Sequence, residues 1–296
     1  MTTFSIQKTA LAAPSSTLPF LFILMWSSGY VVGKLALPYA GPFTLLFLRF
    51  AVAALVLLAI ALATRAPWPT GWKPAAHLVV VGLLVQALQF SSLYTGLKLG
   101  VSAGVSALIV GTMPLFTALG ASVFLHERVS GRQWLGLAAG LGGVALVVAD
   151  RIGGASIAGL GAVSLALAGI TLGTLYQKKY CANADLRTGG FIQLAVASIV
   201  ALPLALVVEG FEVRWTPALV LASGWLSIVN SIGAVSLLFL MMRKGEASKV
   251  ASLFYLIPGT TALMGFAVLG ETLGAMTLAG FAVTAGAVHL CTGKPD

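Results

Sequence analysis

The chain has 296 residues, of which 59% are hydrophobic and 8% are charged, and its formal net charge is +9. A soluble domain carries about 25% charged residues, so this composition excludes the soluble globular, disordered and disulfide-scaffold classes. The apolar runs are long and uninterrupted. They therefore indicate a polytopic all-α membrane protein and exclude a transmembrane barrel, whose strands alternate polar and apolar residues.

Ten segments are long enough, or nearly so, to cross a bilayer, which takes about 20 residues. Short links separate these segments, and none is long enough to form an extramembrane domain. The first helix has no cleavage site after it, so we interpret residues 1–17 as a tail and the helix as uncleaved. In chain order we expect helices at 18–38, 42–63, 75–97, 101–125, 131–149, 156–177, 188–208, 217–241, 247–269 and 274–292.

The basic residues predict the orientation of these helices. They lie singly or in pairs at the ends of apolar runs, without interleaved aromatic residues, so they do not indicate nucleic-acid binding. Twelve of the seventeen fall on the side of the two termini, four fall on the other side, and Arg49 lies within a span. Because cytoplasmic loops are enriched in Lys and Arg, both termini are expected in the cytoplasm.

The two halves of the chain repeat each other. A shift of 144 residues aligns Pro114 with Pro258 and Glu127 with Glu271. The same shift pairs Gly29 with Gly173, Lys34 with Lys178 and Gln86 with Asn230. Each repeat has five spans, an odd number, so the halves must enter the membrane in opposite directions, as in many secondary transporters. We expect one repeat over 18–150, a second over 151–292, and a cytoplasmic tail at 293–296.

The halves resemble the EamA-type repeat of the drug/metabolite transporter superfamily. The resemblance is carried by WSSGYVVGK and LLFLRF in the first two helices, and by LYTGLKLGVSAGVSALIVGTMPLFTALGASVFLHERVSGRQWLGLAAGLGGVALVV and its second copy, GEASKVASLFYLIPGTTALMGFAVLGETLGAMTLAGFAVTAGAVHL. It implies a ten-helix carrier of small metabolites in the bacterial inner membrane. Within the superfamily the chain is most similar to amino-acid exporters, among them the YddG type that exports aromatic amino acids.

Two cations lie inside spans. An Arg at mid-membrane costs at least ~2.5 kcal/mol, so Arg49 should face protein or water. It either anchors a carboxylate or phosphate of the substrate, or it is structural and reaches the outer interface or a neighbouring helix. Lys249, about three residues into the ninth helix, offers the same two alternatives, whereas Lys34 and Lys178 end helices and are expected at the interface.

Three amides and two prolines interrupt the apolar pattern. Gln86, Gln89 and Asn230 either line a shared central cavity or hydrogen-bond between helices. Pro114 and Pro258 each remove a backbone donor in mid-helix. The symmetric pair favours a gate-forming kink in each half, with a fixed kink as the alternative.

Aromatic side chains accompany these polar groups. Rings at membrane depth usually pack against other helices, but they can also stack on a large apolar or aromatic substrate. Trp26 and Tyr30 lie one helical turn apart and can line one face. The candidates for substrate contact are Trp26, Tyr30, Phe90, Tyr94, Tyr176 and Tyr255.

The sequence favours a secondary carrier over a membrane-embedded enzyme. It has no HExxH, no GxSxG and no pair of membrane Asp residues, so it lacks a convergent reactive set. Cys181 and Cys291 have no CxxC spacing, and no Walker motif occurs, so neither metal, cofactor nor ATPase partner is expected. Cationic drugs and nucleotide sugars remain alternative substrates, and a channel is a third option. A ten-helix chain can enclose its path as a monomer within membrane lipid.

Overall fold

The computed structural model describes residues 17–125, 131–151, 156–237, 241, 254 and 256–292. These residues are almost entirely helical, and within them the only β pairing is an isolated bridge between Ala40 and Val213. The elements are α1 (Thr17–Ala36), α2 (Pro42–Ala63), α3 (Trp72–Val81), η1 (Gly82–Leu88), α4 (Gln89–Lys98), α5 (Ala103–Gly111), α6 (Met113–Leu125), α7 (Gly131–Arg151), α8 (Ile157–Tyr180), α9 (Leu186–Glu209), α10 (Pro217–Gly224), η2 (Trp225–Ala234), α13 (Leu256–Leu269) and α14 (Ala275–Thr292).

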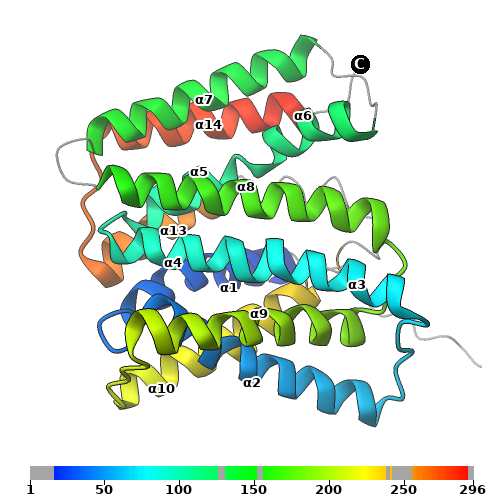
Figure 1. Ribbon diagram of the computed structural model, residues 1–296. Coiled ribbons are helices and arrows are strands. Elements are labelled where there is room, and N and C mark those ends of the chain that lie inside the picture. The colour runs from blue at the N-terminus through cyan, green and yellow to red at the C-terminus, as the bar shows by residue number, and fades with distance from the viewer. Residues whose placement is uncertain are drawn as a thin grey trace, which may run out of the picture.

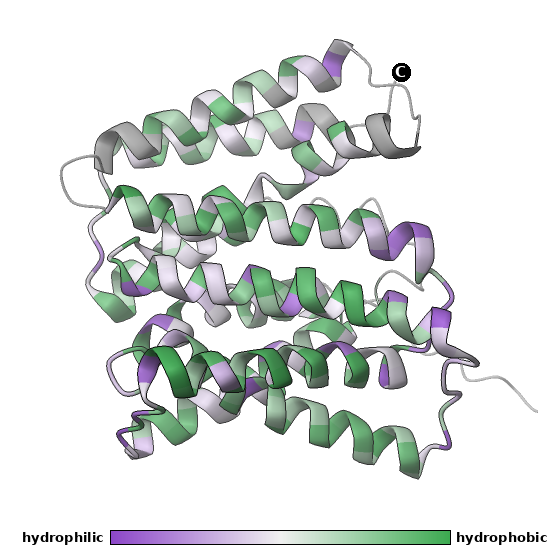
Figure 2. Ribbon diagram, viewed as in Figure 1, coloured by the Kyte–Doolittle hydropathy of each residue, from purple (hydrophilic) through white to green (hydrophobic). Residues whose placement is uncertain are grey.

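Ten apolar helical segments occupy the ten expected positions. Six are long and apolar enough to cross a bilayer, and four shorter ones correspond to the fourth, fifth, ninth and tenth expected helices. Figure 2 shows apolar residues along the helices and hydrophilic ones mainly towards their ends. Large apolar side chains on the outside, such as Val207 and Leu221, are exposed, as lipid-facing residues of a membrane protein are.

Two segments depart from regular α-helix in a way that the sequence did not predict. η1 and η2 are π-helical, and they interrupt the third and eighth helices at equivalent points of the two repeats. A π segment contains one extra residue per turn, is rare, and often marks a functional site. Gln86 belongs to η1 and Asn230 to η2, so the two paired amides lie on the two irregular segments.

The expected single helix over 101–125 is broken at Thr112 into α5 and α6. Pro114 has no amide hydrogen, and its ring crowds the carbonyl of Val110, so the regular ladder cannot continue. The turn is closed locally instead: Thr112 Oγ1 donates to Ile109 O (2.6 Å), and Leu115 N donates to Thr112 O (2.9 Å). Pro258 lies near the start of α13, and most of the residues expected before it in the ninth helix fall outside the described part of the chain.

The main packing contacts join one repeat to the other. α2 packs along α9, α7 along α14, and α4 along α8, while α1 and α5 both pack against α13 (Figure 1). Small residues allow two further close approaches. A methyl group on Gly29 of α1 would collide with Asn230 of η2, and one on the equivalent Gly173 of α8 would collide with Leu84 and Val85 of η1. The two repeats therefore interlock at their centre.

Carboxylates of the second repeat bind helix N-termini of the first. Glu271 accepts from the backbone N of Ala103 at the start of α5 (2.8 Å) and pairs with Lys34 at the end of α1 (2.7 Å). Glu209 accepts from the backbone N–H groups of Phe43 and Thr44 in the first turn of α2. Each carboxylate satisfies orphan N–H groups and complements a helix dipole.

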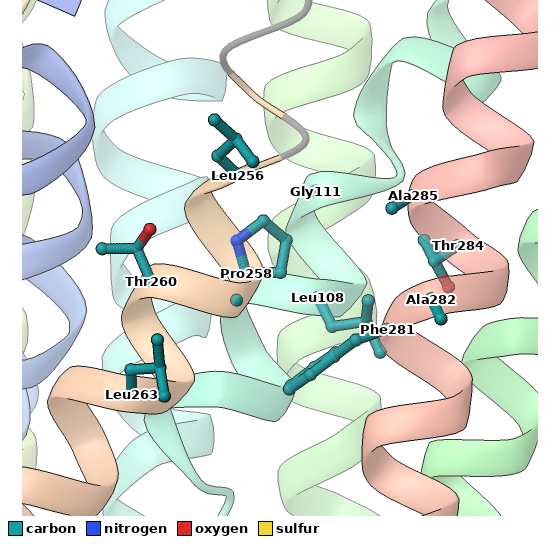
Figure 3. Close-up of a pocket in the computed structure, with 11 residues that line it drawn as sticks. Leu108, Gly111, Leu256, Pro258, Thr260, Leu263, Phe281, Ala282, Thr284 and Ala285 are labelled. Atoms are coloured by element: carbon teal, nitrogen blue, oxygen red, sulfur yellow. The ribbon is translucent and has the colours of Figure 1, made fainter. Parts of the chain in front are cut away.

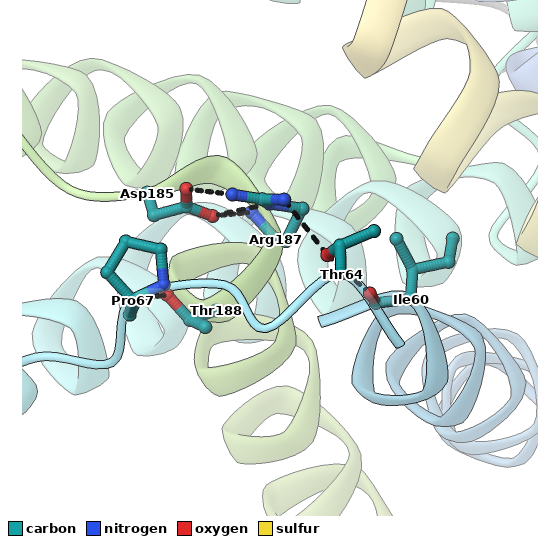
Figure 4. A network of polar contacts seen from close by, with 6 residues as sticks. All are labelled: Ile60, Thr64, Pro67, Asp185, Arg187 and Thr188. Carbon is teal, nitrogen blue, oxygen red and sulfur yellow. Dashed lines mark hydrogen bonds and ion pairs between the residues drawn. The ribbon is translucent and has the colours of Figure 1, made fainter. Parts of the chain in front are cut away.

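A polar network at the opposite end ties the link before α9 to the end of α2 (Figure 4). Asp185 is the N-cap of α9, accepts from the backbone N of Arg187 and pairs with its guanidinium (2.7 Å). Arg187 in turn donates to Thr64 Oγ1 (2.9 Å), and Thr188 Oγ1 donates to Pro67 O (2.9 Å).

Candidate substrate site around Arg49

Arg49 is a buried cation between three helical elements. It lies in the second turn of α2, and 4% of its surface is exposed. Its Nη1 donates to the hydroxyl of Tyr94 on α4 (2.6 Å), and its Nε donates to Ser231 Oγ on η2 (2.8 Å). The side chain therefore turns inward between the two repeats. The alternative that it reaches the outer interface is wrong for this structure.

Aromatic rings surround the guanidinium. Its central carbon lies 4.4 Å from the ring centroid of Phe90 and 5.1 Å from that of Phe50. The two rings meet edge to face at 5.6 Å. Such cation–π contacts hold a cation in place at a site with little water.

No carboxylate among the described residues pairs with Arg49. The acidic side chains whose partners are seen, Asp185, Glu209 and Glu271, are engaged at helix ends. The hydroxyls and rings around Arg49 are neutral, so the positive charge is not compensated within this part of the chain. A buried cation with neutral partners can bind an anionic group, because charge-assisted hydrogen bonds to a carboxylate or phosphate are strong.

Asn230 lies next to Ser231 on η2 and faces α1. Its Nδ2 donates to the backbone carbonyl of Met25, and its side chain packs on Gly29. Its Oδ1 is buried without a hydrogen-bond partner in the described residues. Trp225, also on η2, donates from Nε1 to Ser28 Oγ (2.8 Å), and Ser28 donates to the same Met25 carbonyl.

The two glutamines of the third helix occupy different environments. Gln89 is 4% exposed, its backbone packs against Gly169 of α8, and its Oε1 has no partner in the described residues. Gln86 is half-buried on η1. Gln89 directly precedes Phe90, just as Asn230 directly precedes Ser231, so each orphaned amide oxygen belongs to a neighbour of an Arg49 contact.

The other predicted aromatic residues divide into two groups. Trp26 packs with Phe22 and Phe254 at ring distances of 5.4 and 5.5 Å, and Tyr30 is buried in the central core. Tyr176 lies apart from Arg49, in a smaller cluster in which its hydroxyl contacts His77 Nδ1 at 2.8 Å. Lys249 and Tyr255 fall outside the described residues.

Pro258, one of the two predicted hinge prolines, lines an apolar groove of about 370 Å³ (Figure 3). A methyl group on Gly111, at the end of α5, would lie 3.0 Å from the ring of Pro258, so the fourth and ninth helices cross closely here. Leu108, Phe281 and Thr284 are among the other lining residues, and no charged side chain of the described part of the chain lines the groove. The groove therefore lacks a charged side chain that could bind an ionised substrate, whereas the site around Arg49 has one.

Sequence reasoning missed Ser231, Phe50 and Trp225. A single serine in an apolar helix gives no recognisable sequence signal. Phe50 cannot be distinguished by sequence from a lipid-facing ring, because the buried face of α2 is known only from its packing. The only signal available was position: Ser231 follows the paired amide Asn230, and Phe50 follows Arg49.

The interlocked repeats, the apolar exterior and a buried cation between the halves define a polytopic membrane transporter. The model of the EamA-like transporter family matches residues 15–149 and again residues 157–292. The chain therefore belongs to the EamA-like transporter family of the drug/metabolite transporter superfamily and is not an enzyme.

Several relatives are named as transporters. The inner membrane transporter YedA of Escherichia coli is 26% identical over 92% of this chain and 89% of its own length. A probable amino-acid metabolite efflux pump of Salmonella typhimurium is 28% identical over 89% of both chains, and YvbV of Bacillus subtilis is 29% identical over 92% and 89%. A solved structure at 19% identity matches with a TM-score of 0.65, covering 93% of this chain and 96% of that one, which supports the fold.

Proposed function

We propose that this transporter exports amino acids, with aromatic or other large neutral ones favoured, by alternating access between its two repeats. The observation that carries the proposal is Arg49, a buried guanidinium without a carboxylate partner in the described residues. It would bind the carboxylate of the substrate, while neighbouring rings such as Phe90 would contact an apolar side chain.

The surroundings support the same reading. Arg49 belongs to the first repeat and Ser231 to the second, so their bond crosses the interface that alternating access must rearrange. The path would run near mid-membrane between the first, third, fourth, sixth, eighth and ninth helices. A related chain is named a probable amino-acid metabolite efflux pump. Both termini would lie in the cytoplasm of a bacterial cell, and a single chain would suffice.

The other substrate classes fit the site less well. Cationic drugs would meet the positive charge of Arg49, with no anion among its contacts to attract them. Nucleotide sugars carry phosphates that a guanidinium binds, so they remain the second candidate. A competition panel of aromatic amino acids, small amino acids, nucleotide sugars and cationic drugs separates these classes.

The test is counterflow of labelled phenylalanine into proteoliposomes containing wild type, Arg49→Gln or Arg49→Lys. Because hydrogen bonds to a charged group contribute about 1.5–3 kcal/mol, Arg49→Gln should raise KM by roughly 10- to 100-fold. Arg49→Lys keeps the charge but loses the fork geometry, so it should fall in between.

Arg214→Gln is the matched control, because Arg214 is exposed in the link before α10. It should leave KM unchanged. Normal transport by Arg49→Gln at wild-type expression, or saturable counterflow of none of the amino acids, would refute the proposed function.

A further inference from the structure

We infer that Asn230 Oδ1 is the acceptor for the ammonium group of the substrate, so that the site selects zwitterions. The inference rests on the proposed function, since it assigns the second charged group of a substrate whose carboxylate binds Arg49. Asn230 is 7% exposed, and its Oδ1 has no partner among the described residues. A buried carbonyl-type oxygen left unpaired costs free energy, so a ligand donor that reaches it is stabilised.

The orientation of the Asn230 amide is set by its surroundings. The backbone carbonyl of Met25 can only accept, so the amide must present Nδ2 to it, and Oδ1 then points elsewhere. Gly29 leaves the space that the side chain fills, because any Cβ there would lie 2.7 Å from Nδ2. The amide therefore cannot rotate to satisfy its own oxygen, and Oδ1 stays an acceptor.

The acceptor belongs to the residue next to a hydrogen-bond partner of the cation. Ser231, the next residue of η2, accepts from Arg49 Nε, and it donates to Leu226 O through the five-residue spacing of the π-helix. The extra residue in η2 allows adjacent side chains to face α1 and α2 respectively. The proposed ammonium acceptor, Asn230, thus directly precedes the residue that holds the proposed carboxylate donor, Arg49.

Charge decides which ligands fit this pair. A cationic amine would be repelled by Arg49, which has no anionic partner in the described residues. A carboxylate without an amine would leave Oδ1 unpaired. A zwitterion satisfies both groups with a single molecule. A neutral amide oxygen is also the kind of acceptor available at membrane depth, because the carboxylates of Asp185, Glu209 and Glu271 are bound at helix ends.

The experiment compares two inhibitors of phenylalanine counterflow that differ only in the ammonium group: unlabelled L-phenylalanine and 3-phenylpropionate. Wild type should prefer phenylalanine by at least tenfold. Asn230→Leu, which removes the acceptor, should weaken phenylalanine by about tenfold, leave 3-phenylpropionate within twofold of wild type, and so abolish the preference.

Two further variants make the result specific. Gln193→Leu removes a buried amide on α9 that makes no hydrogen bond to Arg49 or Asn230 among the described residues, and it should retain the wild-type preference. Asn230→Asp keeps an oxygen of the same size and adds a charge. It should increase inhibition by 2-phenylethylamine, and it serves as the decisive variant if Asn230→Leu does not fold.

The outcomes separate the two proposals. If phenylalanine transport depends on Arg49 but Asn230→Leu weakens both inhibitors equally, or leaves the preference intact, the assignment of Asn230 is wrong and the proposed function stands. If Asn230→Asp folds and gains no affinity for 2-phenylethylamine, the assignment is also wrong. If wild type transports no amino acid, both proposals fail.

Discussion

Asp185 shows how one carboxylate secures a link outside the membrane. The hydrogen bond from the Arg187 side chain, against the opposing effect of burial, holds the pKa of Asp185 at about 2, below its usual value of 3.8. The folded protein therefore releases this proton more readily than the unfolded chain. Its contribution to stability is present above about pH 4 and is lost as the pH falls towards 2.

We predict that Asp185→Asn lowers the free energy of unfolding by at most about 1 kcal/mol at pH 7, because asparagine still caps α9 and only the partly exposed ion pair with Arg187 is lost. Thermal melting in detergent at a series of pH values measures it. The difference between wild type and variant should shrink below pH 4, and Glu212→Gln should show no such trend. A difference independent of pH would contradict the role of the ion pair.

The sequence identifies the unusual polar residues of the spans but not the residues that they contact. A charge or amide in an apolar run stands out because burying it is costly, so Arg49, Gln89 and Asn230 could be found from the sequence. What each one contacts depends on the rotation and depth of neighbouring helices, which hydropathy does not encode. The bonds of Arg49 to Tyr94 and Ser231 are therefore visible only in the structure. Tyr176 was predicted at the site but lies with His77 instead.

At the scale of the element, we expect the break between α5 and α6 to take part in transport. We predict that Pro114→Ala slows counterflow at least about threefold while changing the KM less, because an alanine supplies the N–H that lets a helix continue through Thr112 and resist bending. Initial rates and KM from the same proteoliposomes give both quantities. Pro258→Ala should act in the same direction.

Pro203→Ala provides the control for that experiment. Pro203 also lies inside a helix, but α9 runs without interruption from Leu186 to Glu209. Its replacement should leave the exchange rate unchanged. If Pro114→Ala instead lowers rate and binding equally, the proline has a fixed structural role and the gating proposal is wrong.

The helix boundaries followed from the sequence, but the π segments did not. A span is limited by bilayer thickness and by polar residues at its ends, both of which are explicit in the sequence, and α2 begins and ends at the predicted residues. A π segment needs one extra residue accommodated in a turn, and tertiary packing decides where. Here η1 faces Gly173 and η2 faces Gly29, contacts that join distant parts of the chain.

At the scale of the whole molecule, the distribution of acidic residues bears on energy coupling. Proton-coupled carriers usually place a titratable carboxylate or histidine where substrate and proton compete. In the described residues the bound carboxylates lie at helix ends, and His77 contacts Tyr176 and Tyr180 rather than the Arg49 site. We therefore predict facilitated, uniport-like movement down the substrate gradient.

Reconstituted protein should accordingly exchange substrate at the same rate with and without an imposed pH gradient. Flux measured in vesicles of equal and unequal internal pH, with an ionophore control that collapses the gradient, gives the answer. Uphill accumulation driven by a proton gradient alone would rule out this mechanism.

Ten spans and two repeats could be predicted because both are linear properties of the sequence. The pairing of helices could not, since apolar helices in lipid associate through shape and small residues and carry little pattern for their partners. That α2 packs along α9 and α7 along α14 therefore came from the structure alone. Each repeat is contiguous in sequence, but its helices pack mainly against helices of the other repeat.

The interlocking of the repeats has a consequence for biosynthesis. Three polar residues of the first half are bonded to residues that are translated much later. The pairs are Arg49 with Ser231, Lys34 with Glu271, and Ser28 with Trp225. The backbone N–H groups at the start of α2 likewise have no Glu209 carboxylate to donate to until α9 has been synthesised. When the ribosome has completed the first five helices, these polar groups lie in or beside the bilayer without their final partners. We therefore expect the first half, when it is made alone, to be less stable in the membrane than the full chain.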